Sequence, residues 1–231
     1  LKLSRGLGDV YKRQVPIFIK IAGARPYYDT ALAVKAGADV VVLDGMQGGT
    51  AATQEVFIEN VGQPTLACIR PAVDALQDLN SHREVQLVIS GGIRNGADVA
   101  KALALGADAV SIGSAAMIAI GDNDPKWEKE YEKLGSKAGA YDDWHEGNDP
   151  AGISTQKPEL MKRLDPKKAG RKLSNYLKVM SLEAQTIARA CGKNSLHNLE
   201  PEDLCALTVE AAAMARVPLA GTSWVPGIKK K

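Results

Sequence analysis

The stretch that decides the fold is Val85-Gln86-Leu87-Val88-Ile89-Ser90-Gly91-Gly92-Ile93-Arg94-Asn95-Gly96. It starts as an apolar strand over residues 85–90, passes through a glycine pair, and continues into a helix predicted over residues 95–105. Gly106 ends that helix, and a second apolar strand, residues 108–112, follows and ends in Gly113-Ser114. Strand, glycine turn, helix and strand in this order are typical of a βαβ unit with parallel strands.

The same alternation extends upstream. Strands are predicted over residues 15–21 and 39–43, and helices over residues 27–36 and 67–79. Strands that are apolar almost throughout indicate a parallel sheet with helices outside it. Four strands are half of what a closed barrel needs. We therefore expect an α/β fold: the C-terminal half of a (β/α)8 TIM barrel over residues 15–120, followed by a helical extension.

The remaining segments differ from this pattern. Residues 9–14 read like the translated transposon end used in sequencing-library preparation, so we expect residues 1–14 to be an artefact and the N-terminal half of the barrel to be missing. Residues 121–157 are polar and predict a loop insertion. Residues 158–231 predict a helical extension, with helices over residues 158–164, 169–190 and 201–215.

Composition narrows the class of protein. The chain has 231 residues, of which 45% are hydrophobic and 24% charged, with a net charge of +2. These values predict a globular protein and argue against nucleic-acid binding; no apolar run is long enough for a membrane span. Cys68, Cys191 and Cys205 are scattered, which predicts neither a disulfide framework nor a metal site and favours the cytoplasm. We expect Cys191 and Cys205 to be small buried hydrophobic residues.

The two glycine-containing strand ends predict a phosphate site, because the loops after the last two strands of such barrels commonly bind phosphate. Glycine amides can approach phosphate oxygens closely, and Arg94 could add a charge-assisted bond. The alternative is that the glycines only form tight turns, but their presence at two consecutive strand ends favours phosphate. The predicted residues are Ser90, Gly91, Gly92, Arg94, Gly113, Ser114 and Ala115.

Two motifs carry a resemblance to known families. Residues 85–120 resemble the phosphate-binding half shared by FMN-dependent barrels and IMP dehydrogenase. Asp44-Gly45-x-x-Gly48-Gly49-Thr50 resembles the loop of the glutamate synthase FMN domain. That resemblance runs from about residue 15 to residue 227. Residues 185–190 and 218–222 look most like stand-alone glutamate synthase-like subunits, such as the flavin subunit of N-methylglutamate synthase.

The resemblance implies an FMN-dependent enzyme. Its reaction would reduce 2-iminoglutarate, formed from 2-oxoglutarate and ammonia or methylamine, to glutamate or N-methylglutamate. Lys20 matches the lysine that the family places beside flavin and substrate; the alternative is a lysine that merely ends a strand. Asp44 would hydrogen-bond the flavin or only cap the next turn, and Gly48, Gly49 and Thr50 would face a substrate carboxylate. Partner subunits would supply the glutaminase function; the electron donor is not identifiable from these residues.

One departure concerns the iron–sulfur cluster of the family. Its ligand pattern, C-H-x-x-x-C-P-x-G-[IV]-x-T-Q, aligns with residues 144–156, but Trp144 and Asp149 occupy the two cysteine positions and the first cysteine would fall near Ala138. Because such clusters need thiolates, the resemblance implies that a 3Fe–4S cluster is absent. We predict no metal site and a structural role for His145.

Other classes of protein remain open. An IMP dehydrogenase relative would need a nucleophilic cysteine in a glycine-rich loop, whereas Cys68 falls in a predicted helix. A hydroxy-acid oxidase relative would need a catalytic histidine near a late strand end, and all three histidines lie elsewhere. A third alternative is a non-catalytic glutamate synthase-like subunit.

Overall fold

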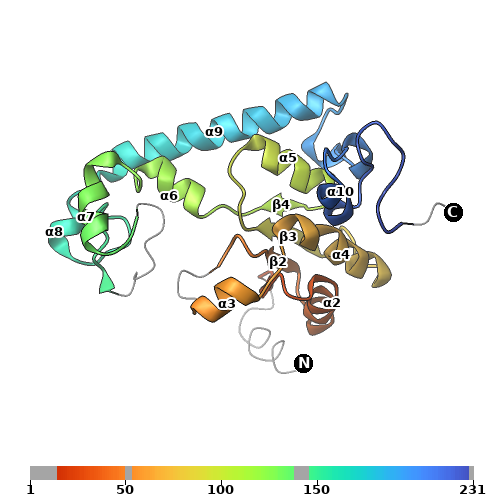
Figure 1. The fold of residues 1–231 in the computed structure, drawn as a ribbon, viewed down its shortest axis with the longest axis horizontal. Coiled ribbons are helices and arrows are strands. Elements are labelled where there is room, and N and C mark those ends of the chain that lie inside the picture. The colour runs from red at the N-terminus through yellow and green to blue at the C-terminus, as the bar shows by residue number, and fades with distance from the viewer. Residues whose placement is uncertain (1–14, 50–53, 138–145, 229–231) are drawn as a thin grey trace.

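The protein contains a four-stranded parallel sheet with the strand order β1-β2-β3-β4 (Figure 1). A computed structural model describes residues 15–49, 54–137 and 146–228. Helices alternate with the strands, as the sequence predicts, although β4 is shorter than the predicted strand over residues 108–112. The strands are β1 (Phe18–Ala22), β2 (Val40–Asp44), β3 (Gln86–Ser90) and β4 (Ala109–Val110).

One face of the sheet forms the core. Val41, Leu43, Leu87 and Ile89 are fully buried there and belong to one cluster with residues of the covering helices. Alternate strand residues point to the opposite face, where the Phe18 side chain is 63% exposed. The covering helices, each following a strand or a strand-end loop, are α2 (Pro26–Ala36), α4 (Thr65–Asp78) and α5 (Gly96–Ala104).

A long helix, α9 (Pro166–Ala190), crosses the helices that follow the last two strands (Figure 1). Asp165 caps it by accepting hydrogen bonds from the N–H groups of Lys167 and Lys168. Its backbone contacts α5 closely: a Cβ on Gly96 would lie 2.3 Å from the Met180 carbonyl oxygen. The shorter elements between β4 and α9 are α6 (Ser114–Ile120), η1 (Pro125–Trp127), α7 (Glu128–Lys133) and α8 (Pro158–Met161).

The helix predicted over residues 201–215 is wrong as a single element. It consists of η4 (Pro201–Asp203) and α10 (Val209–Ala215), preceded by η3 (Leu196–Asn198). The break arises because Ala206 pairs its backbone with a later segment, donating to the Pro218 carbonyl and accepting from the Ala220 N–H. Thr208 then caps α10 by accepting from the Ala211 N–H.

Three further observations concern single features. The sequence did not predict α3 (Glu55–Asn60). Cys191 and Cys205 are exposed, so the prediction that they are buried is wrong, whereas Cys68 is buried in α4. Among the described residues, no helix has the length and apolar character that a membrane crossing requires.

Candidate functional site

The candidate site lies where the parallel strands end at their carboxyl edge. Ala22, Asp44 and Ser90 are register partners across β1, β2 and β3, so these strands end level with one another. Lys20, Asp44 and Ser90 lie on the face opposite the core, because they alternate with the buried strand residues. Ligands of parallel α/β sheets bind at this edge.

Lys20 and Asp44 form an ion pair on that face. The Lys20 Nζ lies 2.8 Å from Asp44 Oδ2, and the two side chains are 51% and 8% exposed. The pair follows from the register: Lys20 is opposite Val42, and Asp44 is two residues further along β2 on the same face. The lysine therefore presents its ammonium group to the open face, whereas the carboxylate is enclosed.

The glycine loop after β2 encloses Asp44. Its Oδ2 accepts a hydrogen bond from the Gly49 N–H at 3.2 Å, a contact within the turn that follows β2. Its Oδ1 is buried and has no hydrogen-bond partner among the described residues. A Cβ on Gly48 would lie 1.8 Å from that Oδ1, so only glycine fits over the carboxylate. Thr50, predicted to bind substrate with Gly48 and Gly49, lies outside the described residues.

A second set of contacts fixes this loop against the β3 end. The Gln47 Oε1 accepts from the Thr65 N–H at 2.9 Å and lies 2.9 Å from the Thr65 hydroxyl, which is also 2.8 Å from the Gly91 carbonyl oxygen. The Gly45 N–H donates to the Ser90 carbonyl oxygen at 3.1 Å. Sequence reasoning missed Gln47 and Thr65; the usable signal was a threonine directly after Pro64 at the start of a helix.

The two predicted phosphate loops differ in why they contain glycine. Gly91 and Gly92 have φ angles of +100° and +78°, which favour glycine in a turn whether or not a ligand binds. Gly113, just before α6, has a φ of −125°, and a Cβ placed on it would meet nothing within 4 Å. Space beside the Gly113 backbone is therefore open, as the close approach of a ligand requires.

Arg94 lies at the entrance of α5 and is already paired. Its backbone N–H and its Nε both donate to Asp98 Oδ2, at 3.1 and 3.0 Å, and its side chain is 75% exposed. The Gly96 N–H, at the start of α5, donates to Glu183 Oε2 at 2.8 Å. In this arrangement the carboxylates of Asp98 and Glu183 occupy the N-terminus of α5.

Cys68 borders the same edge but is unsuited to nucleophilic chemistry. Its Sγ is packed 3.6 Å from the Gln63 carbonyl oxygen, and the residue is fully buried. Burial raises the pKa of the Cys68 thiol to about 11, so the reactive thiolate is scarce at neutral pH. This argues against a cysteine mechanism of the IMP dehydrogenase kind for the described residues.

Asp149, which stands at a cysteine position of the family pattern, has a different task. It is fully buried. Its Oδ2 accepts from the Ile153 N–H at 2.7 Å and from the Ser154 N–H at 2.8 Å, and its Oδ1 accepts from the Ala151 N–H at 2.9 Å. The carboxylate thus organises the loop from residue 149 to residue 154. Ala138, Trp144 and His145, the other positions of that pattern, lie outside the described residues.

The electrostatics around Asp149 are consistent with this role. Burial pushes the pKa of its carboxyl up, but hydrogen bonds from Ser154, Tyr131, Ala151 and Ile153 together outweigh burial and hold the pKa below its usual range. The Tyr131 hydroxyl lies 2.9 Å from Asp149 Oδ1. Burial and the neighbouring carboxylates raise the pKa of Tyr131, so it remains a neutral donor. Among the described residues, no three His, Cys, Asp or Glu side chains are grouped to hold a metal.

The chain is similar to proteins of one family. The conserved region in glutamate synthase matches residues 3–125 and 140–194. A glutamate synthase large subunit-like protein of Rhizobium meliloti is 81% identical over 221 residues, covering 96% of this chain and 50% of that protein. An archaeal glutamate synthase [NADPH] of Methanocaldococcus jannaschii is 38% identical over 199 residues, covering 86% of this chain and 36% of that protein. The chain therefore spans half of the first relative and about a third of the second.

Solved structures show the fold. A flavocytochrome b2 variant with sulfite bound has a TM-score of 0.52 at 19% identity, covering 85% of this chain and 37% of that chain. The variant with pyruvate bound has the same TM-score at 18% identity, covering 97% and 41%. These flavoenzymes are TIM barrels, which confirms the expected α/β fold as part of such a barrel. With most of its length matched by the conserved region of glutamate synthase, the chain belongs to the glutamate synthase family.

Proposed function

We propose that this oxidoreductase-family chain is the FMN-binding part of an enzyme that reduces 2-iminoglutarate to glutamate, or its methylamine-derived counterpart to N-methylglutamate. The observation that carries the proposal is the Lys20–Asp44 pair: a half-exposed ammonium at the carboxyl edge of the sheet, oriented by a buried carboxylate 2.8 Å away. It lies at the carboxyl edge of the same sheet whose strands β3 and β4 lead into the two glycine loops. A cation held there favours negative charge on a flavin or on a substrate carboxylate.

The residues present fit an FMN phosphate. Ser90, Gly91 and Gly92 after β3, and Gly113, Ser114 and Ala115 after β4, would hold it through backbone amides, with Arg94 at the rim. The open space beside Gly113 supports this assignment. When bound, reduced FMN supplies hydride from N5 to an imine carbon.

The chain's own residues would bind and orient the substrate. Lys20 would be the catalytic residue, facing a substrate carboxylate with its ammonium group. The Gly48 N–H donates to the Gly45 carbonyl oxygen and the Gly49 N–H to Asp44, so both amides are used inside the loop in this conformation. Gly48 and Gly49 would therefore contribute by letting the substrate approach the backbone closely, since they have no side chains. Lys20 would donate the hydrogen bond to the substrate carboxylate.

We further propose that the loop over residues 138–149 holds no 3Fe–4S cluster. The support is that Asp149, a weak substitute for a thiolate, already accepts hydrogen bonds from three backbone amides and two hydroxyls. Electrons would then reach the flavin from another donor. We also propose an assembly with glutaminase-type and other glutamate synthase-like subunits in the cytoplasm. The name of the Rhizobium meliloti relative, a large subunit-like protein, supports an assembly of several subunits.

Two measurements on the full-length protein test the proposal. Its absorbance spectrum should show flavin bands without a broad iron–sulfur shoulder; a folded but colourless protein would contradict flavin binding and favour the non-catalytic alternative. Reductive synthesis from 2-oxoglutarate with ammonia, and separately with methylamine, identifies the amine. Lys20→Met should lower kcat by about 10²–10³-fold, the typical effect of removing one electrostatic group. Lys35→Met, at an exposed lysine of α2, is the matched control and should change neither measurement.

A further inference from the structure

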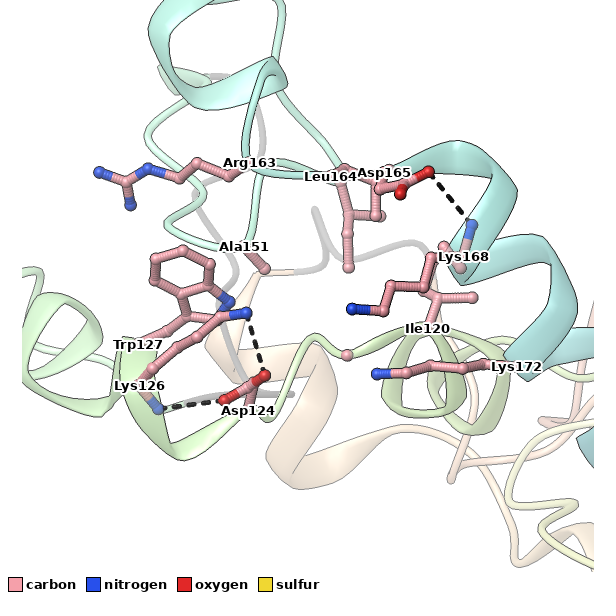
Figure 2. A pocket seen from close by; sticks show the side chains of 13 residues that line it. Ile120, Asp124, Lys126, Trp127, Ala151, Arg163, Leu164, Asp165, Lys168 and Lys172 are labelled. Carbon is pink, nitrogen blue, oxygen red and sulfur yellow. Dashed lines mark hydrogen bonds and ion pairs between the residues drawn. The ribbon is translucent and has the colours of Figure 1, made fainter.

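A second concave site lies away from the strand ends, beside the start of α9 (Figure 2). It has a volume of about 270 Å³ and is formed by η1, the turn after α6, the loop that Asp149 organises and the first turns of α9. This volume is below the range of roughly 300–1,000 Å³ typical of pockets for drug-sized ligands. A ligand of this cavity is therefore small.

Four cations and two carboxylates, Asp124 and Asp165, line the cavity, and two of the cations form ion pairs. Lys126 Nζ lies 3.1 Å from Asp124 Oδ2. Arg163 Nη1 lies 2.8 Å from Glu130 Oε2 and also donates to the Pro150 carbonyl oxygen at 2.9 Å. These two side chains are held at the rim by contacts within the protein.

Lys168 and Lys172 are different. Both project from α9 into the cavity (Figure 2), and no ion pair joins either one to an acid among the described residues. They are four residues apart on one helix face, where like charges destabilise a helix by about 0.2–0.5 kcal/mol. Lys168 also lies in the first turn of α9, where the helix dipole disfavours cations. An anion between the two ammonium groups would offset both penalties.

The aromatic wall of the cavity is not available for stacking. Lys126 Nζ lies 4.6 Å from the centre of the Trp127 ring, and the Arg163 guanidinium carbon lies 4.9 Å from it. Cations thus already occupy the neighbourhood of the indole face. A ligand would be recognised by its charge and compactness, with no need for an aromatic group.

We propose that this cavity binds a small dianion, a phosphate or a dicarboxylate, between the ammonium groups of Lys168 and Lys172. Each ammonium offers three donors, which matches the several oxygens of such an anion. The site does not depend on the proposed flavin chemistry, because none of its lining residues belongs to the Lys20 edge of the sheet.

Calorimetric titration of the full-length holoprotein with inorganic phosphate and, separately, with succinate tests the proposal at constant ionic strength. Succinate is a dicarboxylate without the keto group that imine formation needs. The matched pair of variants is Lys168→Gln/Lys172→Gln, inside the cavity, and Lys167→Gln/Arg171→Gln, on the same two turns but outside its lining. Both remove two positive charges.

We expect saturable binding of at least one of the two anions, unchanged in the Lys167/Arg171 variant and at least tenfold weaker in the Lys168/Lys172 variant. Phosphate alone or succinate alone would identify the ligand class. Equal weakening of binding in both double variants would overturn the proposal, because it would show diffuse attraction of anions by a basic helix end. Failure of the wild-type protein to bind either anion would also overturn it. Circular dichroism checks folding, and if the double variant is unfolded, Lys172→Gln alone should still weaken binding several-fold.

Discussion

Replacing Asp149 by alanine should destabilise the loop after the barrel strands strongly. The fully buried carboxylate accepts hydrogen bonds from three backbone amides, from Ser154 Oγ at 3.1 Å and from the Tyr131 hydroxyl. Each buried donor left without an acceptor costs about 1–3 kcal/mol. Because water can enter the vacated space and serve some of them, we expect a total loss of about 3–5 kcal/mol in the free energy of unfolding of this region.

Asp149→Asn keeps the shape of the side chain but removes its charge and one of its two acceptor oxygens, so it tests these two properties separately from shape. Both carboxylate oxygens accept bonds, whereas an amide would turn an NH2 group toward one set of donors. Asp149→Asn should therefore lose nearly as much stability as Asp149→Ala. Glu132→Ala, at an exposed carboxylate in α7, is the matched control and should stay within about 0.5 kcal/mol of wild type.

Two measurements on the full-length protein check this reasoning. Urea denaturation gives the loss of stability, and hydrogen exchange at the amides of Ile153 and Ser154 gives its location. Both amides should be protected in wild type and in Glu132→Ala, and exchange rapidly in both Asp149 variants. A loss below about 1 kcal/mol with protection retained would refute the idea that this carboxylate holds the loop.

The pH dependence follows from the lowered pKa of Asp149. A carboxyl whose pKa is lower in the folded than in the unfolded state stabilises the fold above the unfolded pKa of about 3.9, and this contribution is lost as the pH falls through the folded pKa. The stability difference between wild type and Asp149→Asn should therefore be constant near neutral pH and shrink in acid below about pH 4. A difference that grows in acid would contradict the assigned hydrogen bonds.

Two further predictions concern glycines and thiols. Gly48→Ala places a Cβ 1.8 Å from Asp44 Oδ1, so it should lower the free energy of unfolding by about 1–3 kcal/mol and weaken retention of the proposed flavin. Gly170→Ala, in the second turn of α9 where an added Cβ meets nothing within 4 Å, should instead stabilise the protein by about 0.5–1 kcal/mol. Thermal melts and flavin absorbance measure both effects. Alkylation of the native protein should modify the exposed thiols of Cys191 and Cys205, whereas Cys68 should react only after unfolding, because burial raises the pKa of its thiol to about 11. Peptide mapping identifies the modified cysteines, and labelling of Cys68 in the native protein would contradict its packing.

Local sequence patterns were sufficient to predict most of the helices and strands of the barrel segment. The apolar strands and the glycines just after α2 and α5 are local signals, so β2, β3, α2 and α5 lie within about two residues of their predicted bounds. The helix predicted over residues 201–215 was wrong because Ala206 pairs with a segment more than ten residues away, and a local pattern carries no information on such pairing.

The sequence predicted which residues belong to the candidate site, but it did not predict the contacts between their side chains. Lys20 and Asp44 were each singled out, but their ion pair depends on the register of β1 against β2, which neither strand sequence contains alone. Gln47 and Thr65 were missed because a side-chain bond across 18 residues has no sequence pattern. The aspartate at a cysteine position of the resembling pattern is visible in the sequence, but the hydrogen bonds that Asp149 accepts are not.

The contact between α9 and the β3 loop has a consequence for biosynthesis. The Gly96 N–H reaches Glu183 across 87 residues of sequence, and the Tyr176 hydroxyl bonds the Arg94 carbonyl oxygen across 82. At about 5–20 residues per second, ribosomes need roughly 4–17 s to make the intervening chain. The loop after β3 therefore leaves the ribosome well before the helix that supports it. With the flavin phosphate bound at that loop, as proposed above, flavin capture should be a late event of synthesis, and messages truncated before α9 should yield chains that do not retain the flavin.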